Sequence, residues 1–252
     1  MPRKAREKSE NGIYHIILRG INKQTIFEEE EDNVRFLQTL KDYKEKSGYK
    51  IYAYCLMGNH IHLLLQEGSE ELGITMRRIG ASYVYWYNCK YKRCGHLFQD
   101  RYKSETVDSE SYFMVVVRYI HQNPLKAGLV TDIADYKWSS YNEFIGKNSV
   151  TDVDFVLDII NNDREKATKS FEALHKEINN DRCLELEEKR RMTDDEAIEI
   201  IREVCNTRNC LEVQNFESHM RDEILKRLKT EGMSTRQIAR LTGVSRAIVL
   251  KV

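Results

Sequence analysis

The chain has 252 residues, 41% of them hydrophobic, and its 40 basic residues balance its 40 acidic ones. This length suffices for one large domain or two ordinary ones. No stretch approaches the roughly 20 apolar residues of a membrane span, and the charged N-terminus has no apolar segment behind it. We therefore expect a protein without membrane partners or a secretory signal, located in the cytoplasm.

The charges are unevenly divided along the chain. Residues 1–150 carry 22 basic and 19 acidic residues, residues 151–225 carry 11 and 20, and residues 226–252 carry 7 and 1. Two basic ends around an acidic middle suggest contact with a polyanion such as nucleic acid, although a charged run is more often a solvated helix face. The six cysteines form no C-x-x-C pair, which favours reduced thiols over a zinc ribbon or disulfides.

The first elements alternate between strand and helix. Residues 12–20, GIYHIILRG, are rich in residues that favour strands. Residues 33–48 predict a helix that ends at Gly48. The apolar face expected for this helix consists of Val34, Leu37, Leu40 and Tyr43.

A β-hairpin is predicted next. The strand-like runs YKIYAYCLM and HIHLLLQE are joined by Gly58 and Asn59, a dipeptide suited to the positive φ angles of a tight turn. A helix over 72–92 follows, with Met76, Ile79, Tyr83 and Trp86 on one face, and then a short strand near YKSETV.

A further helix should begin after Asp108 or Ser109 and end by Asn123, because Pro124 disfavours the helical conformation of the residue before it. The resulting order, β-α-β-β-α-β, predicts an α+β, ferredoxin-like domain over residues 1–148.

The rest of the chain reads as helical. We expect an acidic helical linker at 149–192 and a helical DNA-binding domain at 193–252, which opens with a capping box of Thr193 and Glu196. A helix-turn-helix is predicted at 215–252. Its signals are a helix with Phe216, Met220, Ile224 and Leu228, a capping box of Ser234 and Gln237, a turn at Gly243, and a cap at Ser245.

Two histidines on the second hairpin strand are the first candidate site. Side chains two apart on a strand share a face, so His60 and His62 project together while Ile61 and Leu63 point the other way. Such a pair can ligate one metal ion if a third ligand arrives from elsewhere. Two histidines on a half-exposed strand without a ligand are the plainer alternative.

A second motif supplies further candidates. Tyr119 and Asn123 are four residues apart, so on a helix they share a face, and a phenol beside an amide oxygen could approach a metal held by the histidines. Taken alone this is weak evidence, because the chain has 14 tyrosines and most tyrosines serve packing.

The combination resembles the REP-associated tyrosine transposases of the single-tyrosine HUH superfamily. The resemblance covers about residues 10–145. It rests on the His-x-His strand, on LFQDRYKS at 97–104, on YIHQNPLKAGLV at 119–130 and on YKWSSY at 136–141.

The resemblance implies an enzyme that cleaves and joins single-stranded DNA at repeated palindromic or hairpin elements. By motif, His60 and His62 would be metal ligands, Tyr119 the nucleophile that forms a 5′-phosphotyrosine link, and Asn123 the third ligand. Related enzymes often have Gln at that last position. The implied cofactor is Mg²⁺ or Mn²⁺, and imidazole ligands tilt this choice toward Mn²⁺.

DNA contacts are expected from basic residues interleaved with aromatic ones, because phosphate contact and stacking together hold single strands. Between residues 76 and 126 nine residues are basic and four acidic. The candidates in the first domain are Arg77, Arg78, Lys90, Lys92, Arg93, His96, Gln99, Arg101 and Lys103.

The C-terminal domain would add duplex recognition through Arg236, Ser245 and Arg246, the last two at the start of the recognition helix. A helical bundle used only for docking is the alternative for this domain. For the whole chain, a DNA-binding regulator without catalysis and a metal-dependent hydrolase of a small substrate stay open as other functions. Composition does not decide between monomer and dimer.

Overall fold

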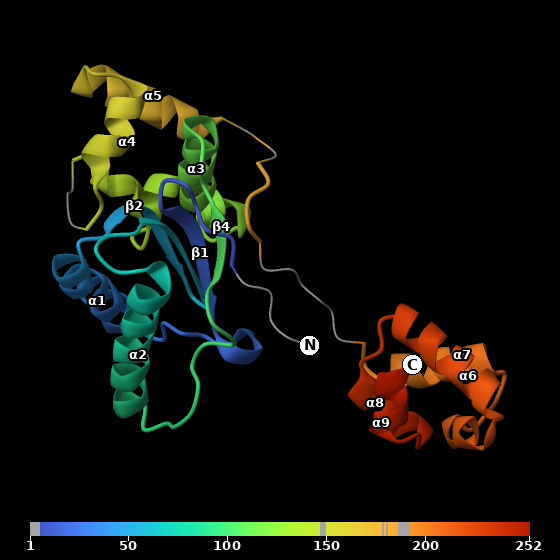
Figure 1. Ribbon diagram of the computed structural model, residues 1–252. Coiled ribbons are helices and arrows are strands. Elements are labelled where there is room, and N and C mark those ends of the chain that lie inside the picture. The colour runs from blue at the N-terminus through green and yellow to red at the C-terminus, as the bar shows by residue number, and fades with distance from the viewer. Residues whose placement is uncertain (1–5, 147–149, 178, 180, 186–191) are drawn as a thin grey trace. The chain divides into compact units, whose positions relative to one another are not determined.

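The computed structural model describes residues 6–146, 150–177, 179, 181–185 and 192–252 (Figure 1). The chain divides into two compact units, Met1–Leu186 and Glu187–Val252, each with its own core. No helix in the described residues is both long and apolar enough to cross a membrane.

The first unit is built on a four-stranded antiparallel sheet of order β2-β3-β1-β4. Its elements follow the order β1 (Ile13–Arg19), α1 (Glu30–Ser47), β2 (Lys50–Met57), β3 (His60–Gln66), α2 (Leu72–Lys90), β4 (Lys103–Thr106) and α3 (Glu110–Lys126). The β-α-β-β-α-β order expected from the sequence is thus confirmed, and the fold is α+β with a helical C-terminal region.

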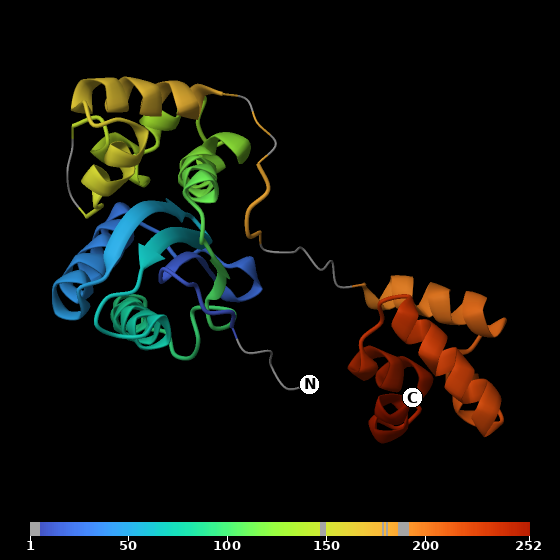
Figure 2. The same ribbon diagram turned by 45° about the horizontal axis from the view of Figure 1, so that its top comes forward.

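Helices cover both faces of the sheet (Figure 2). One core joins α1 and α2 to the face that carries Ile61 and Leu63. The other joins α3 to the face that carries Leu64 and Cys55. Because side chains alternate along β3, His60 and His62 lie on the α3 face, opposite Ile61 and Leu63 as predicted.

The buried face of α1 differs from the expected one. Val34 is 57% exposed, whereas Phe36 and Leu40 are fully buried and Leu37 and Tyr43 lie partly buried at the margin. The helix begins three residues earlier than predicted, at Glu30, with Glu29 as its cap. The buried apolar face of α1 is therefore centred on Phe36 and Leu40, and Val34 lies outside this face.

The hairpin turn lies where it was predicted but has another conformation. Neither Gly58 nor Asn59 takes a positive φ. The loop after β1 supports the turn instead, because Gly58 O accepts from Ile26 N at 2.8 Å and Asn59 O accepts from Gly20 N at 2.9 Å.

The predicted end of α3 at Asn123 is wrong. The helix runs through Pro124 to Lys126, and Ser109 is its N-cap. Pro124 lacks a backbone N–H donor, and it lies in the last turn of the helix. The backbone oxygens near this end still find donors: Ala127 N donates to Asn123 O, and Leu129 N donates to Pro124 O.

The segment expected as an acidic linker mostly belongs to the first unit. Helices α4 (Val153–Ile160) and α5 (Arg164–Lys176) bury Val156, Leu157 and Phe171 in the core shared with α3. These apolar residues form a buried stripe, so the acidic residues between them are only the solvated face of packed helices.

The second unit consists of α6 (Asp194–Cys205), α7 (Ser218–Thr230), α8 (Thr235–Thr242) and α9 (Arg246–Lys251). The predicted capping box of Thr193 and Glu196 is confirmed. Gly243 ends α8 with a positive φ, and Ser245 caps α9. Short 3-10 helices occur in the two units at Ile21–Lys23, Ile133–Asp135, Ser140–Glu143 and Cys210–Asn215.

Two details of this unit differ from expectation. Phe216 precedes α7 and Met220 is 56% exposed, while Leu225 and Leu228 are the residues that α7 buries. Ser234 caps α8 by accepting from Gln237 N, but the Gln237 side chain bonds Met192, Thr193 and Asp194. The predicted box is therefore half formed, and its second half ties α8 to the start of α6.

Candidate functional site

The paired histidines lie on β3, in the layer between the sheet and α3. The ring centroids of His60 and His62 are 5.1 Å apart with the rings at a steep angle, so the two rings converge. His62 is 3% exposed and His60 is partly buried. The two side chains share a face because residues alternate along a strand. The strand itself is fixed by its pairing with β1 on one side and β2 on the other.

Each ring is held through its Nδ1 atom. His62 Nδ1 lies 3.1 Å from Nε2 of His15 on β1, and His15 Nδ1 lies 2.8 Å from Oε1 of Glu105 on β4. His60 Nδ1 lies 2.7 Å from Oδ1 of Asn59. In both His60 and His62, the other ring nitrogen, Nε2, is therefore the atom that can bind a further partner.

Burial lowers the pKa of both histidines. It brings the pKa of His60 to about 4, helped by the nearby Arg19 cation, and takes the pKa of His62 well below its ordinary value, helped by His15 and His60. At neutral pH both rings are thus uncharged, which is the form that binds metal.

The predicted nucleophile contacts the rings of His15 and His62. Tyr119 projects from α3, is 4% exposed, and has its ring centroid 5.8 Å from that of His15 and 5.9 Å from that of His62. Its hydroxyl donates to Oε1 of Glu185 at 3.4 Å. Burial and the Glu185 carboxylate raise the pKa of Tyr119, so the resting side chain is a neutral phenol.

Asn123 lies one turn further along α3. Its Nδ2 donates to the backbone oxygen of Tyr119 at 2.8 Å, an i to i−4 contact along the helix. The bond orients the amide with its Oδ1 turned away from the helix backbone. The extension of α3 past Pro124 thus keeps Asn123 and Tyr119 on the same helical face, as the sequence predicted.

The donors present suit a divalent cation. The two neutral imidazoles offer Nε2 nitrogen donors, and Asn123 on α3 carries an amide oxygen. No group of three or more His, Cys, Asp or Glu side chains among the described residues is arranged to hold a metal ion. An amide such as that of Asn123, water or substrate would add to the two nitrogen donors.

Comparison with known proteins finds a matching family. Residues 8–123 match the model of the family described as "Transposase IS200 like". This segment is similar to the IS200-like transposases. It contains His60, His62, Tyr119 and Asn123. No curated protein sequence matches the chain.

A solved structure resembles this chain in fold. It is a REP-associated tyrosine transposase bound to a REP hairpin, 18% identical, and the match covers 61% of this chain and 93% of that one with a TM-score of 0.51. At this identity the likeness shows the fold alone.

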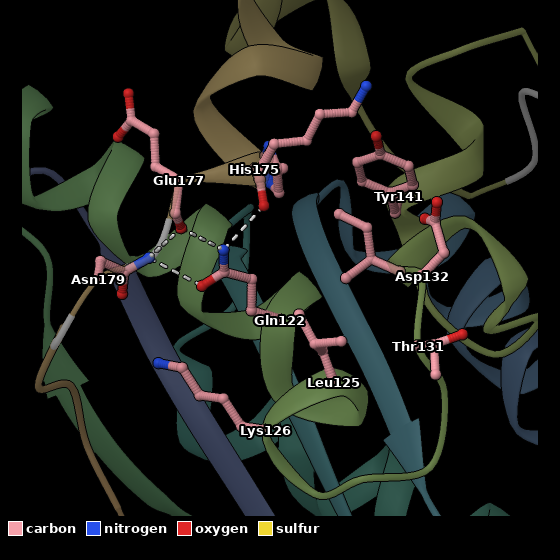
Figure 3. Close-up of a pocket in the computed structure, with 11 residues that line it drawn as sticks. Gln122, Leu125, Lys126, Thr131, Asp132, Tyr141, His175, Glu177 and Asn179 are labelled. Atoms are coloured by element: carbon pink, nitrogen blue, oxygen red, sulfur yellow. Dashed lines mark hydrogen bonds between the residues drawn. The ribbon is translucent and has the colours of Figure 1, made fainter.

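A cavity borders the far end of α3 in the first unit (Figure 3). It has a volume of about 320 Å³ and lies between the C-terminal turn of α3 and the end of α5. Gln122 on its floor donates to the backbone oxygens of His175 and Glu177 and accepts from Asn179. Lys126 lines this cavity, and its ammonium also lies over the ring of Tyr119.

The predicted DNA contacts of the first unit separate into groups. Arg77 and Arg101 are exposed and line one cavity of about 380 Å³ together with Arg6, Phe98 and Tyr102. Lys92, His96 and Gln99 are exposed in the segment between α2 and β4, and Arg93 lies over the Tyr87 ring at 5.5 Å. These residues remain available for phosphate contact or stacking.

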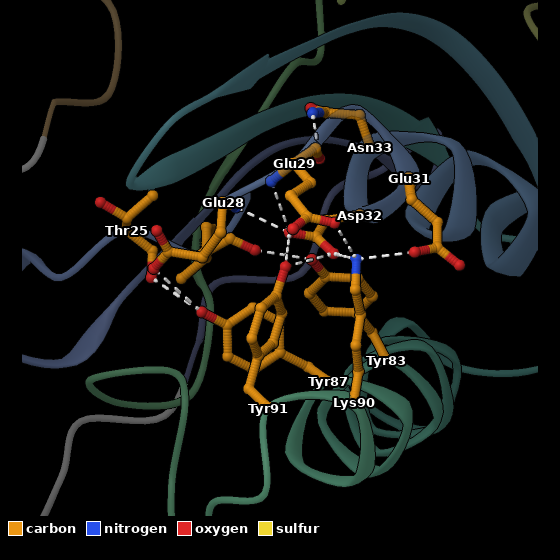
Figure 4. Close-up of polar contacts among 11 residues, drawn as sticks. Thr25, Glu28, Glu29, Glu31, Asp32, Asn33, Tyr83, Tyr87, Lys90 and Tyr91 are labelled. Atoms are coloured by element: carbon orange, nitrogen blue, oxygen red, sulfur yellow. Dashed lines mark hydrogen bonds and ion pairs between the residues drawn. The ribbon is translucent and has the colours of Figure 1, made fainter.

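Lys90 is placed differently (Figure 4). Its ammonium pairs with Glu29 at 3.1 Å, Glu31 at 2.8 Å and the fully buried Asp32 at 2.8 Å. Its charge neutralises the start of α1, and this counts against the predicted phosphate contact. Arg78 is likewise paired, with Glu70. A list of basic residues cannot show such pairing, because the partners lie on other elements.

Lys103 lies on the histidine face of the sheet. Both Lys103 on β4 and His62 on β3 stand opposite Ile17 of β1, so the three form one cross-strand row. Strands are about 4.8 Å apart, which places the two backbones about 10 Å from each other. The exposed Lys103 ammonium is thus a cation beside the histidine site.

The three predicted contact residues of the second unit are exposed: Arg236 on α8, Ser245, which caps α9, and Arg246 at the start of α9. Arg240 lies on the same helix as Arg236. Its guanidinium forms an ion pair with Asp194 and so links α8 to the start of α6.

Sequence reasoning left out four residues that the structure adds to the site. His15 contacts His62, and Glu105 contacts His15. Glu185 accepts from the Tyr119 hydroxyl, and the Lys126 ammonium lies 4.8 Å from the Tyr119 ring centre. The available signal was a histidine in an otherwise apolar strand, IYHIILR, but only the strand order brings it beside His62.

Proposed function

We propose that the first unit cleaves and rejoins single-stranded DNA at palindromic or hairpin elements through a covalent tyrosine intermediate. The observation that supports the proposal is the edge contact of the Tyr119 ring with His62, whose ring lies beside that of His60. The match of residues 8–123 to the IS200-like transposases supports the same chemistry.

In this reaction the Tyr119 oxygen attacks the scissile phosphorus. A bond forms between the phenolic oxygen and the 5′ phosphate, and the bond to the 3′ oxygen breaks. The proton lost by the phenol is balanced by the proton gained by the 3′ oxygen. Because one phosphodiester replaces another, the free 3′-hydroxyl can reverse the step, and joining needs no external energy source.

His60, His62 and Asn123 would hold a divalent cation, Mn²⁺ or Mg²⁺. When bound, such an ion polarises the phosphate and stabilises the charge that develops on its oxygens. The chain's own part is to keep both imidazoles neutral through burial and to keep the phenol protonated until substrate arrives.

The DNA would be held by groups on both units. Lys103 is suited to a phosphate near the site, and Arg77, Arg101 and the aromatic side chains of their cavity are suited to the flanking strand. In the second unit, Arg236, Ser245 and Arg246 would read a duplex segment. The hairpin bound by the solved relative makes a hairpin a reasonable substrate for this chain.

The test uses 3′-labelled oligonucleotides with palindromic arms and randomised flanks, incubated with Mn²⁺ and resolved on a denaturing gel. We expect a labelled covalent adduct with the wild-type chain and none with Tyr119→Phe. His60→Ala should lose the adduct and still shift the oligonucleotide in a native gel. An adduct with Tyr119→Phe contradicts the mechanism, and binding without any adduct in wild type favours a DNA-binding regulator.

A further inference from the structure

We propose that Glu105 and His15 form a positioning pair that fixes His62 in the one tautomer able to offer Nε2 to a cation. The inference rests on the proposed function and deepens it, because it concerns the same site. Neither residue touches the substrate or the ion in this account, and both act through His62.

The chain of hydrogen bonds begins at a charged carboxylate. Burial opposes ionisation of Glu105, but hydrogen bonds from His15, Leu184 N and Tyr112 hold its pKa below its ordinary value. The Leu184 bond is 2.8 Å long. An ionised carboxylate can only accept, so the His15 Nδ1 atom at 2.8 Å must carry the proton and donate it.

The direction of this hydrogen bond determines the direction of the next one, between His15 and His62. When His15 is neutral with its proton on Nδ1, its Nε2 carries a lone pair and accepts the hydrogen bond at 3.1 Å, and His62 Nδ1 donates it. His62 is left with an unprotonated Nε2. This atom is the only ring nitrogen of His62 that can face a ligand.

His60 reaches the same tautomer by another route. Asn59 Nδ2 donates to the backbone oxygen of Lys23, which turns its Oδ1 toward His60 Nδ1 at 2.7 Å. The amide oxygen accepts, so His60 also carries its proton on Nδ1. Two unrelated contacts thus prepare both rings in the same way, which a purely structural role would not require.

Packing makes the pair rigid. His15 is fully buried, its ring stacks on that of His62 with centroids 5.3 Å apart, and it stands directly opposite Glu105 in the sheet. Carboxylates that orient metal-binding histidines are typically worth about 10-fold to 100-fold in metal affinity. We expect a loss of that size when the chain of bonds is cut.

A second buried histidine pair provides a matched control. His121 bonds His175 at 2.9 Å and Ser140 at 2.7 Å, and His175 bonds the backbone oxygen of Phe171. These contacts satisfy buried groups without a carboxylate and without reaching His62. A substitution at His121 disturbs packing comparably but leaves the positioning pair intact.

The first experiment measures Mn²⁺ affinity of the full chain by calorimetry, without DNA. His15→Phe and Glu105→Leu should bind about 10-fold to 100-fold more weakly. His15→Gln should retain most of the affinity, because its amide can donate to Glu105 and accept from His62. His121→Phe should match wild type. Equal affinity of His15→Phe and wild type, or no Mn²⁺ binding by wild type, overturns the proposal.

The second experiment needs no variant to fold. Imidazole nitrogen NMR of the metal-free wild-type chain should show His62 protonated on Nδ1 and unprotonated on Nε2. A proton on Nε2 of His62 contradicts the pair's role. Neither readout uses DNA, so a protein that shows both signatures but forms no tyrosine adduct would refute the proposed reaction and leave the positioning pair standing.

Discussion

The Lys126 ammonium lies 4.8 Å from the centre of the Tyr119 ring. The two residues are seven apart on α3, about two helical turns, so they share one side of the helix. Burial and Glu185 raise the pKa of the Tyr119 phenol, whereas a cation on the ring face favours the phenolate. The Lys126 cation therefore acts against burial and Glu185, which keep the Tyr119 phenol protonated.

Replacing Lys126 with Met should slow formation of the tyrosine adduct about 10-fold, because a partly desolvated contact of this kind contributes about 1 to 2 kcal/mol. The measurement is the single-turnover rate at saturating DNA and Mn²⁺. Lys176→Met is the control, since Lys176 lines the same cavity as Lys126 but lies on α5, away from the tyrosine on α3. Equal slowing in both variants would refute a specific role for Lys126.

Asn123→Ala should weaken Mn²⁺ binding about 10-fold, because it removes the amide oxygen that the helix orients. Asn123→Asp keeps an oxygen at that position and should restore binding. Calorimetry without DNA provides the comparison. If both variants bind like wild type, the third ligand is not Asn123.

Lys103 and Lys90 should differ in their effect on DNA binding. Lys103→Ala removes a cation on the histidine face, so affinity for a single strand should fall and its salt dependence should decrease by about one counterion. Lys90→Ala should leave both quantities unchanged, because that charge already neutralises carboxylates. Fluorescence titrations at several salt concentrations test this, and a reversed order would show that ion pairing does not decide DNA contact.

The same Lys90→Ala variant should lose stability. It leaves the Asp32 carboxylate, which is fully buried, without its cation (Figure 4). Hydrogen bonds to charged groups contribute about 1.5 to 3 kcal/mol, so we expect about 2 kcal/mol less free energy of unfolding. Both tryptophans, Trp86 and Trp138, belong to the first unit, so their fluorescence in urea reports its unfolding alone. Unchanged stability would mean that Tyr91 and the backbone suffice for Asp32.

Acid should destabilise the first unit through its buried histidines. Burial lowers the pKa of His175 to about 4, against an ordinary value of 6.5. Between these values the unfolded chain binds more protons, so stability falls as pH decreases from 6.5 toward 4, by up to about 1.4 kcal/mol per pH unit for each such group. His175→Gln should reduce that slope by up to one proton, whereas His96→Gln, at an exposed position, should not. Equal slopes in all three proteins would contradict the assignment.

Local patterns were enough for much of the fold. Strand alternation placed His60 and His62 on one face, and the spacing of Tyr119 and Asn123 placed them on one side of a helix. The caps at Ser109, Thr193 and Ser245 were readable because a cap is a contact between residues three apart. The end of α3 was not, since Pro124 disfavours a helix locally but is accommodated in its last turn.

The tertiary structure alone decided which groups face one another. His15 reaches His62, and Glu105 reaches His15, only because β1 lies between β3 and β4 in the sheet. Lys90 meets the carboxylates at the start of α1 for a similar reason, since α2 packs beside that helix. Such contacts join residues that are far apart in the chain, and their energy depends on burial and on partners that no local spacing encodes.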